Sequence, residues 1–129
     1  MTEIKKFTKI VILYYGIAGL LFAFLYLVLT DMQLMIWAYN DPVTFWSLGG
    51  TMLVLAIASF LAFFKKEWEQ IKLYFEIMLM WIIGALLMNV AIVTLITLPE
   101  SWIFSQILDF VVLSFNLIVG LIAYVKQRG

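Results

Sequence analysis

The residue that most needs a chemical explanation is Asp109, the only charged side chain inside the last of four long apolar runs. Counted from Ser101, it lies about 12 Å into that run, at about 1.5 Å of rise per helical residue. An ionised aspartate near the middle of a bilayer costs at least about 2.5–3.5 kcal/mol, so we expect Asp109 to face the interior of a bundle. Gln106, Asn116 and Gly120 share its helical face and would form a polar seam with it.

Other runs offer polar partners at a similar depth. Asn89 lies about 13–14 Å from the external end of the third run, and Thr51 reaches a comparable depth in the second. If the helices pack side by side, Asp109, Asn89 and Thr51 can form one buried cluster. Trp81 lies about 13–14 Å from the opposite end of the third run. Trp81 can pack between helices with its indole N–H bonded to a carbonyl or to Asn116. Alternatively, it can line a cavity for a lipid or another small lipophile.

Two roles are open for the polar cluster around Asp109. Its members can hydrogen-bond the helices together, each bond contributing about 0.6 kcal/mol on average. Alternatively, the carboxyl binds a proton or a cation. Burial disfavours the charged carboxylate and no basic residue lies at its depth, so we expect a protonated Asp109 at neutral pH unless a cation is bound. The first role is the simpler one, because a single carboxylate with no basic partner supplies few of the groups that a transport pathway needs.

The elements that must position these residues follow from the composition. The chain has 129 residues, of which 66% are hydrophobic and 12% charged, whereas soluble domains are about 45–50% apolar and about 25% charged. So short a chain has no means of hiding that much apolar surface in water. We therefore predict an all-α fold: a four-helix transmembrane bundle, up-down-up-down, in a single domain of residues 1–129. The helices are expected at about 10–29, 43–64, 71–98 and 101–125, and the first is too long to be a cleaved signal sequence.

The charges predict the orientation of this bundle. All eight Lys and Arg residues fall in the N-terminal tail, in the connection 65–72 or in the C-terminal tail, and the two other connections carry only acidic charges. By the positive-inside rule both termini are cytoplasmic in a multi-pass protein of the cell membrane. Near the same interface, Lys72 and Glu76 are spaced for an ion pair across one helical turn.

Helix ends and aromatic residues give further expectations. Asp41 precedes Pro42 as an N-cap would, with the proline at the first helical position. The apolar stretch 34–37 before it is expected in the membrane interface. Tyr14, Tyr15 and Tyr26 lie toward the two ends of the first helix, where tyrosine rings are typical of the headgroup level. Between them, a pair of small residues four apart, at positions 19 and 23, favours close approach of a neighbouring helix.

Several kinds of chemistry are excluded by what the chain lacks. It has no Cys and no His, so thiol redox chemistry, haem ligation and the usual metal sites are not expected. No catalytic triad, phosphate-binding glycine loop or dinucleotide fingerprint is present. The net charge is zero, which gives no reason to expect a nucleic-acid partner. We therefore predict a protein without cofactor, metal or enzymatic activity.

One stretch carries a resemblance to a known family. The start of the second helix at Asp41-Pro42, the following Trp46 and Gly49-Gly50, and the long third helix resemble those of small DoxX-like four-helix membrane proteins. The resemblance implies a compact bundle, in some cases associated with redox partners or small lipophilic ligands. It implies no catalytic residue, because the matching positions are structural.

Three functions are compatible with these observations. The leading prediction is a small accessory or oligomerising subunit of a membrane complex, whose partners are the lipid bilayer and either further copies or other membrane subunits. It rests on small-residue patches in the first, second and fourth helices that exceed what one internal interface requires. The first alternative is a lipid- or lipophile-binding protein with a pocket near Trp81, Asp109 and Asn116. The second is a proton- or cation-linked transporter or channel subunit that uses Asp109.

Overall fold

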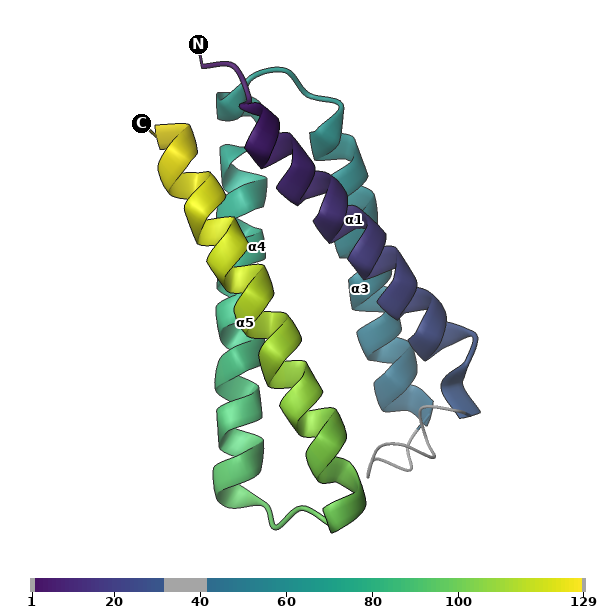
Figure 1. The fold of residues 1–129 in the computed structure, drawn as a ribbon. Helices are drawn as coiled ribbons and strands as arrows, with labels where there is room; N and C mark the ends of the chain where they lie inside the picture. Colours follow the sequence, from purple (N-terminus) through teal and green to yellow (C-terminus); the bar gives the residue numbers. More distant parts are fainter. Residues whose placement is uncertain (1, 32–41, 129) are drawn as a thin grey trace.

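Four helices make up most of the described chain. The computed structural model describes residues 2–31 and 42–128, which form α1 (Lys6–Leu27), α3 (Pro42–Phe63), α4 (Trp68–Leu95) and α5 (Glu100–Arg128) (Figure 1). The predicted all-α, four-helix fold is confirmed for these residues. The expectations for Asp41 as an N-cap and for 34–37 as an interfacial stretch lie outside the described residues.

Each helix is long and apolar enough to cross a membrane. Many large apolar side chains face outward, among them Leu95, which is 81% exposed, and Phe64 and Phe104, each 75% exposed. Such a surface is unfavourable in water and ordinary against lipid tails, where helices satisfy their own backbone hydrogen bonds. The chain is a multi-pass integral membrane protein.

Four helix ends differ from the predicted ones by three or four residues. Helix α1 begins at Lys6 and α4 begins at Trp68, in both cases several residues before the predicted start. Helix α4 ends earlier than predicted, at Leu95, and α5 continues to Arg128 through residues predicted to be a tail. The predicted ends followed the limits of the apolar runs. A helix does not have to stop there, because its backbone groups stay bonded within the helix when it enters the headgroup region.

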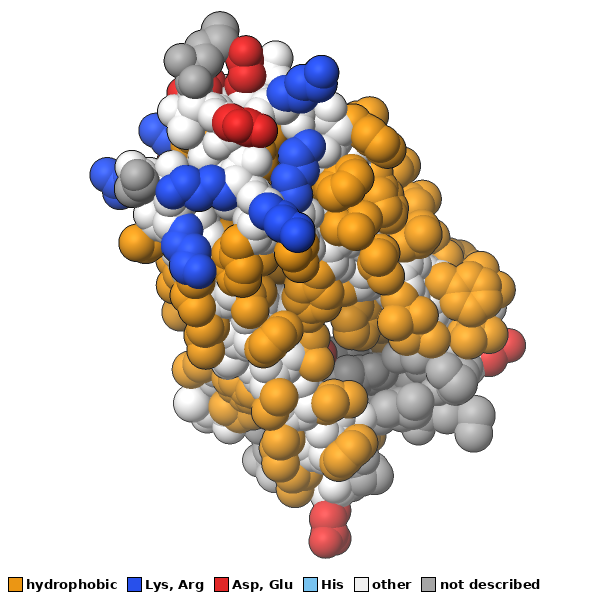
Figure 2. Space-filling view, turned by 45° about the horizontal axis from the view of Figure 1, so that its top comes forward, with side chains coloured by type: hydrophobic (Ala, Val, Ile, Leu, Met, Phe, Trp, Pro, Cys, Tyr) orange, Lys and Arg blue, Asp and Glu red, His pale blue; other side chains and the backbone are white. Residues whose placement is uncertain are grey.

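Both chain termini and the connection between α3 and α4 lie at one end of the bundle (Figure 1). We call this end, comprising residues 2–9, 64–76 and 124–128, the charged end, because it carries all eight Lys and Arg residues. Figure 2 shows blue Lys and Arg side chains gathered at one end, with mostly orange apolar side chains along the length of the helices. The opposite end, where α1 and α4 end and α3 and α5 begin, is called the far end.

The N-terminal segment ties the charged end together. Ile4 donates its backbone N–H to the carbonyl of Lys66 at 3.1 Å, and the Trp68 N–H donates to the carbonyl of Thr2 at 2.7 Å. The buried side chain of Gln127 accepts from the Lys5 N–H at 2.9 Å. The segment is thus bonded both to the start of α4 and to the end of α5.

The helices form a ring of neighbours in which the contacts are unequal. Helix α1 lies against α3 and α5, and α4 lies against α5 and α3, but the α1–α3 contact is by far the most extensive. Gly19 is one reason, since a Cβ atom there would lie 3.2 Å from the Cβ of Ala56 and 3.3 Å from the carbonyl oxygen of Met52. Ala23, the other member of the small pair, is 2% exposed. The α1–α3 pair therefore packs as one unit.

The hydrophobic core is concentrated toward the charged end. It is built around the fully buried Phe75 of α4, whose ring contacts those of Tyr15, Trp68, Tyr74 and Tyr124. The buried members of this cluster are Ile4, Val11, Ile12, Tyr15, Ala62, Trp68, Ile71, Phe75, Met78, Leu79, Ile82 and Ala123. None of them comes from the beginning of α3 or of α5 or from the end of α1 or of α4. The core thus closes the bundle at the charged end.

Candidate functional site

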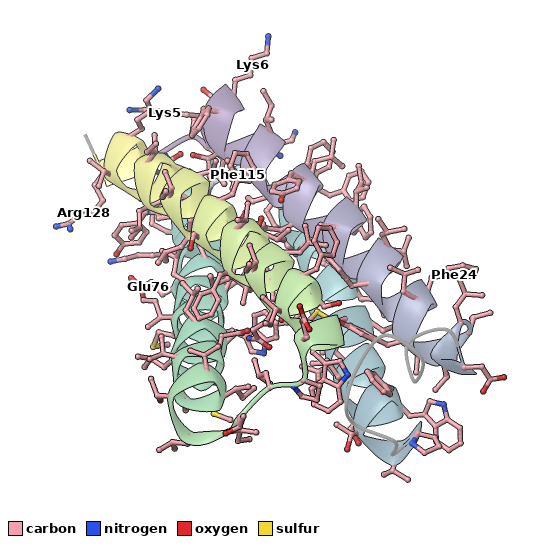
Figure 3. All side chains as sticks on the ribbon, turned by 60° about the horizontal axis from the view of Figure 1, so that its bottom comes forward. Lys5, Lys6, Phe24, Glu76, Phe115 and Arg128 are labelled. Carbon is pink, nitrogen blue, oxygen red and sulfur yellow. The ribbon has the colours of Figure 1, made fainter. Side chains whose placement is uncertain are left out.

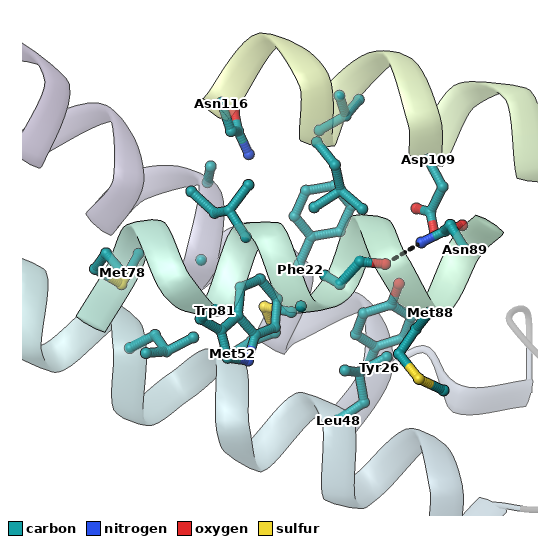
Figure 4. A pocket seen from close by; sticks show the side chains of 18 of the residues that line it. Phe22, Tyr26, Leu48, Met52, Met78, Trp81, Met88, Asn89, Asp109 and Asn116 are labelled. Atoms are coloured by element: carbon teal, nitrogen blue, oxygen red, sulfur yellow. Dashed lines mark hydrogen bonds between the residues drawn. The ribbon is translucent and has the colours of Figure 1, made fainter. Parts of the chain in front are cut away.

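A cavity of about 760 Å³ lies inside the bundle and is lined by all four helices. It begins at Tyr15 and Asn116, beside the core, and extends to Phe45, Ile92 and Gln106 toward the far end. Its walls are mostly apolar. Figure 4 shows Asp109, Asn89 and Tyr26 near one another in one part of the cavity, with Trp81, Asn116 and Met78 toward the other. The separation of the α1–α3 pair from the α4–α5 pair beyond the core creates this space.

Asn89 and Gln106 form a bonded pair across the interface between α4 and α5. The Gln106 amide donates to Oδ1 of Asn89, and both side chains are buried. The Asn89 amide also donates to the carbonyl of Ala85, one turn earlier in α4, at 2.9 Å. These bonds explain why two amides are tolerated inside lipid-facing helices, since an unpaired buried amide is costly. They also fix the orientation of the Asn89 side chain.

Asp109 projects into the cavity from α5, one turn after Gln106. Its side chain is half-buried, and its carboxyl interacts with the amide of Asn89. The Tyr26 hydroxyl of α1 is close enough to interact electrostatically with Asp109. The Tyr26 ring is in turn stacked on Phe45 of α3, with ring centroids 5.8 Å apart. Asp109 therefore lies near Asn89 of α4 and Tyr26 of α1, and the Tyr26 ring connects it to Phe45 of α3.

Asn116 joins α5 to α1 at the other side of the cavity. The Tyr15 hydroxyl donates to the backbone carbonyl of Asn116 at 2.6 Å, and the Tyr14 hydroxyl donates to its side-chain oxygen. Tyr15 and Tyr26 are both buried and line the cavity, so their rings point into the bundle. Their expected depth at the headgroup level stays a prediction, because burial depends on the direction of a ring around the helix axis and not on its depth.

Thr51 does not join the polar cluster. It is exposed, it does not line the cavity, and its hydroxyl donates to the carbonyl of Ser47 in its own helix at 3.0 Å. Its depth in the membrane matched that of Asp109, but its direction around the α3 axis points it out of the bundle. Trp81, by contrast, is half-buried and lines the cavity (Figure 4).

Lys72 and Glu76 form a separate polar group at the charged end. Their side chains lie 3.9 Å apart as an ion pair, and Glu76 also accepts a hydrogen bond of 2.8 Å from the Tyr124 hydroxyl. Figure 3 shows Glu76 at the same end of the bundle as Lys5, Lys6 and Arg128. Neither Lys72 nor Glu76 lines the cavity. This group joins α4 to α5 and is distant from the cluster around Asp109.

Sequence inspection therefore found the polar part of the cavity but missed most of its walls. The missed residues include three aromatic side chains of α1 and α3, namely Phe22, Tyr26 and Phe45. Within residues 2–31 and 42–128, no three His, Cys, Asp or Glu side chains lie close enough together to hold a metal ion. The described residues thus make the cavity an apolar and aromatic space to which they contribute one carboxyl and a few amides.

The chain matches no model of a known protein family, and no curated protein or solved structure is significantly similar to it. The resemblance to DoxX-like proteins stays a prediction.

Proposed function

We propose that this protein binds a lipophilic molecule in the intramembrane cavity between the α1–α3 pair and the α4–α5 pair, without catalysing a reaction. The observation that carries the proposal is the cavity itself, with its volume of about 760 Å³. Ligand sites typically enclose about 300–1,000 Å³, with apolar and aromatic walls and a few polar groups that orient the ligand. The polar groups here are gathered around Asp109 and Asn89 (Figure 4).

A role as an oligomerising or accessory subunit receives less support from the same packing. The small residues that motivated it are largely used inside the chain: a Cβ atom at Gly19 would meet Ala56, and one at Gly120 would overlap the hydroxyl of Tyr15. Of the glycines in α3, α4 and α5, Gly50 and Gly84 have no atom within 4 Å of such a Cβ. Contacts within one chain therefore explain most of these small residues without a second chain.

For orientation, we propose that the charged end faces the cytoplasm of a cell membrane. Support comes from the position of all eight Lys and Arg residues at that end and of Asp31, after the end of α1, and Glu100, at the start of α5, near the other. The positive-inside rule counts basic residues close to the membrane-spanning segments, as these are. The cavity then lies nearer the external half of the bilayer.

Extraction of the purified protein tests the lipophile-binding proposal. The protein is purified in a neutral detergent, extracted with organic solvent and analysed by mass spectrometry against an extract of the source membrane. We expect one compound or compound class to be enriched over its share in the bulk lipid. Recovery of bulk lipid in bulk proportion contradicts the proposal.

A matched pair of variants connects that enrichment to the cavity. Gly84 lines the cavity and Gly50 does not, yet a Cβ atom at either meets no other atom within 4 Å. Gly84→Phe places a ring at the cavity wall, whereas Gly50→Phe places the same ring elsewhere. We expect Gly84→Phe to lose the enriched compound and Gly50→Phe to retain it. Equal retention by both variants places the ligand outside the cavity.

A further inference from the structure

The described part of the chain contributes one carboxyl and no group of opposite charge to the cavity. Asp109 is the only Asp or Glu among the lining residues that the structure describes, and none of these is Lys or Arg. All eight basic residues lie at the charged end, where the only ion pair of the described residues joins Lys72 to Glu76. A carboxylate in apolar surroundings without a counter-charge is strongly unfavourable. An ionised Asp109 therefore requires a cation that the chain does not supply.

The amides beside Asp109 do not replace that cation. Asn89 and Gln106 are bonded to each other, and Asn89 is also bonded to the carbonyl of Ala85. One amide reaches the carboxyl of Asp109, whereas carboxylates that stay ionised when buried usually accept two or three hydrogen bonds or contact a cation. The carboxyl is thus held in place while its charge remains uncompensated.

Aromatic side chains form part of the remaining cavity wall, beside aliphatic residues and methionines. Five of its lining residues are aromatic: Tyr15, Phe22, Tyr26, Phe45 and Trp81. The faces of such rings attract cations, most strongly where water is excluded, and aromatic cages are a common means of binding quaternary ammonium groups. A hydrated metal ion instead requires several oxygen ligands. Rings and a single carboxyl therefore match an organic cation with an apolar body.

Resting on the function proposed above, we propose that the preferred ligand is a monovalent lipophilic cation, with its charge against Asp109 and its apolar body among the aromatic rings. Asp109 is protonated when the cavity is empty of cations. Binding then exchanges charge for charge: one cation enters, and the carboxyl releases one proton to the solvent. The net charge of the cavity is the same before and after binding.

This exchange makes binding depend on pH in a defined direction. Among residues 2–31 and 42–128, the titratable groups that line the cavity are Asp109 of α5 and the phenols Tyr15 and Tyr26 of α1, while α3 and α4 contribute none. Phenols ordinarily titrate near pH 10, so below that pH Asp109 is the group of these three whose proton competes with a bound cation. Because the proton and the cation compete for one carboxyl, affinity for the cation rises with pH. Affinity for a neutral lipophile does not.

Three probes of similar shape test the proposal: tetraphenylphosphonium, the isosteric anion tetraphenylborate and neutral triphenylphosphine oxide. Equilibrium dialysis measures their binding to the whole chain in a neutral detergent, with protein-free micelles as the baseline. We expect saturable binding of the cation, preferred over the other two probes by about tenfold or more at pH 8. The preference should decrease at pH 6 and disappear in Asp109→Asn, whereas Thr51→Val, outside the cavity, should retain it.

The outcomes separate this inference from the function on which it rests. Equal binding of the cation and the neutral probe, or a preference that neither pH nor Asp109→Asn changes, overturns the inference and leaves a lipophile-binding cavity standing. Absence of saturable binding for every probe counts against both. If Asp109→Asn does not fold, the pH series on the unmodified protein decides the question by itself.

Discussion

Replacing Gly120 with alanine should loosen the bundle where α1, α4 and α5 meet. A Cβ atom at this position would overlap the hydroxyl oxygen of Tyr15 and lie 2.7 Å from a methyl carbon of Leu79. The Tyr15 ring has little room to withdraw, because that residue is only 4% exposed. To make space, the hydroxyl must leave the carbonyl of Asn116, to which it donates at 2.6 Å.

The expected loss of stability follows from three effects. Inserting a methyl group into a filled core costs about 1–3 kcal/mol. A hydrogen bond between membrane helices contributes about 0.6 kcal/mol on average and at most about 1.7. The helix propensity of alanine returns about 1 kcal/mol relative to glycine. We therefore expect Gly120→Ala to lower the free energy of unfolding by about 1–3 kcal/mol.

Two further glycines serve as matched controls. Gly50→Ala and Gly84→Ala add the same methyl group where no atom lies within 4 Å, so we expect each to raise stability by about 0.5–1 kcal/mol. The assay is unfolding in mixed micelles with an increasing fraction of sodium dodecyl sulfate, followed by circular dichroism. A Gly120→Ala protein as stable as Gly84→Ala would refute the proposed close contact of α5 with Tyr15 and Leu79.

Three other predictions concern packing and orientation. Phe75→Ala should lower the free energy of unfolding by about 2–3 kcal/mol in the same assay. Water-soluble cores lose about 3–5 kcal/mol in such a substitution, but here the exposed apolar surface meets lipid and not water. Leu73→Ala, on an exposed face, should leave stability nearly unchanged, and equal losses for the two variants would contradict the assignment of Phe75 to the core. Thr51→Val should leave stability within about 0.5 kcal/mol of the parent, since the hydroxyl bonds only to its own helix; a larger loss would indicate a partner for Thr51. Reporters fused after residues 68 and 100 should report cytoplasmic and external locations respectively, and the reverse pattern would invert the proposed topology.

The sequence determined the number of spans, the end of the bundle that carries the basic residues and the depth of the polar groups. Each of these depends on position along the chain. Apolar length predicts a span, and a rise of about 1.5 Å per residue converts residue number into depth. Residue number therefore sufficed to match Asp109 with Asn89 in depth, and the two side chains do line one cavity in the folded protein.

What only the tertiary structure decided was the direction in which each side chain points around its helix axis. In a water-soluble protein an apolar stripe marks the inward face of a helix. These helices are apolar on nearly every side, because lipid is as favourable to leucine as the core is. Depth therefore predicted a place for Thr51 beside Asp109, and packing turned it outward; packing likewise turned Tyr15 and Tyr26 inward. These side-chain directions determine which residues line the cavity, in the region where the extensive α1–α3 contact separates that pair from α4 and α5. No pattern along the chain predicts the directions.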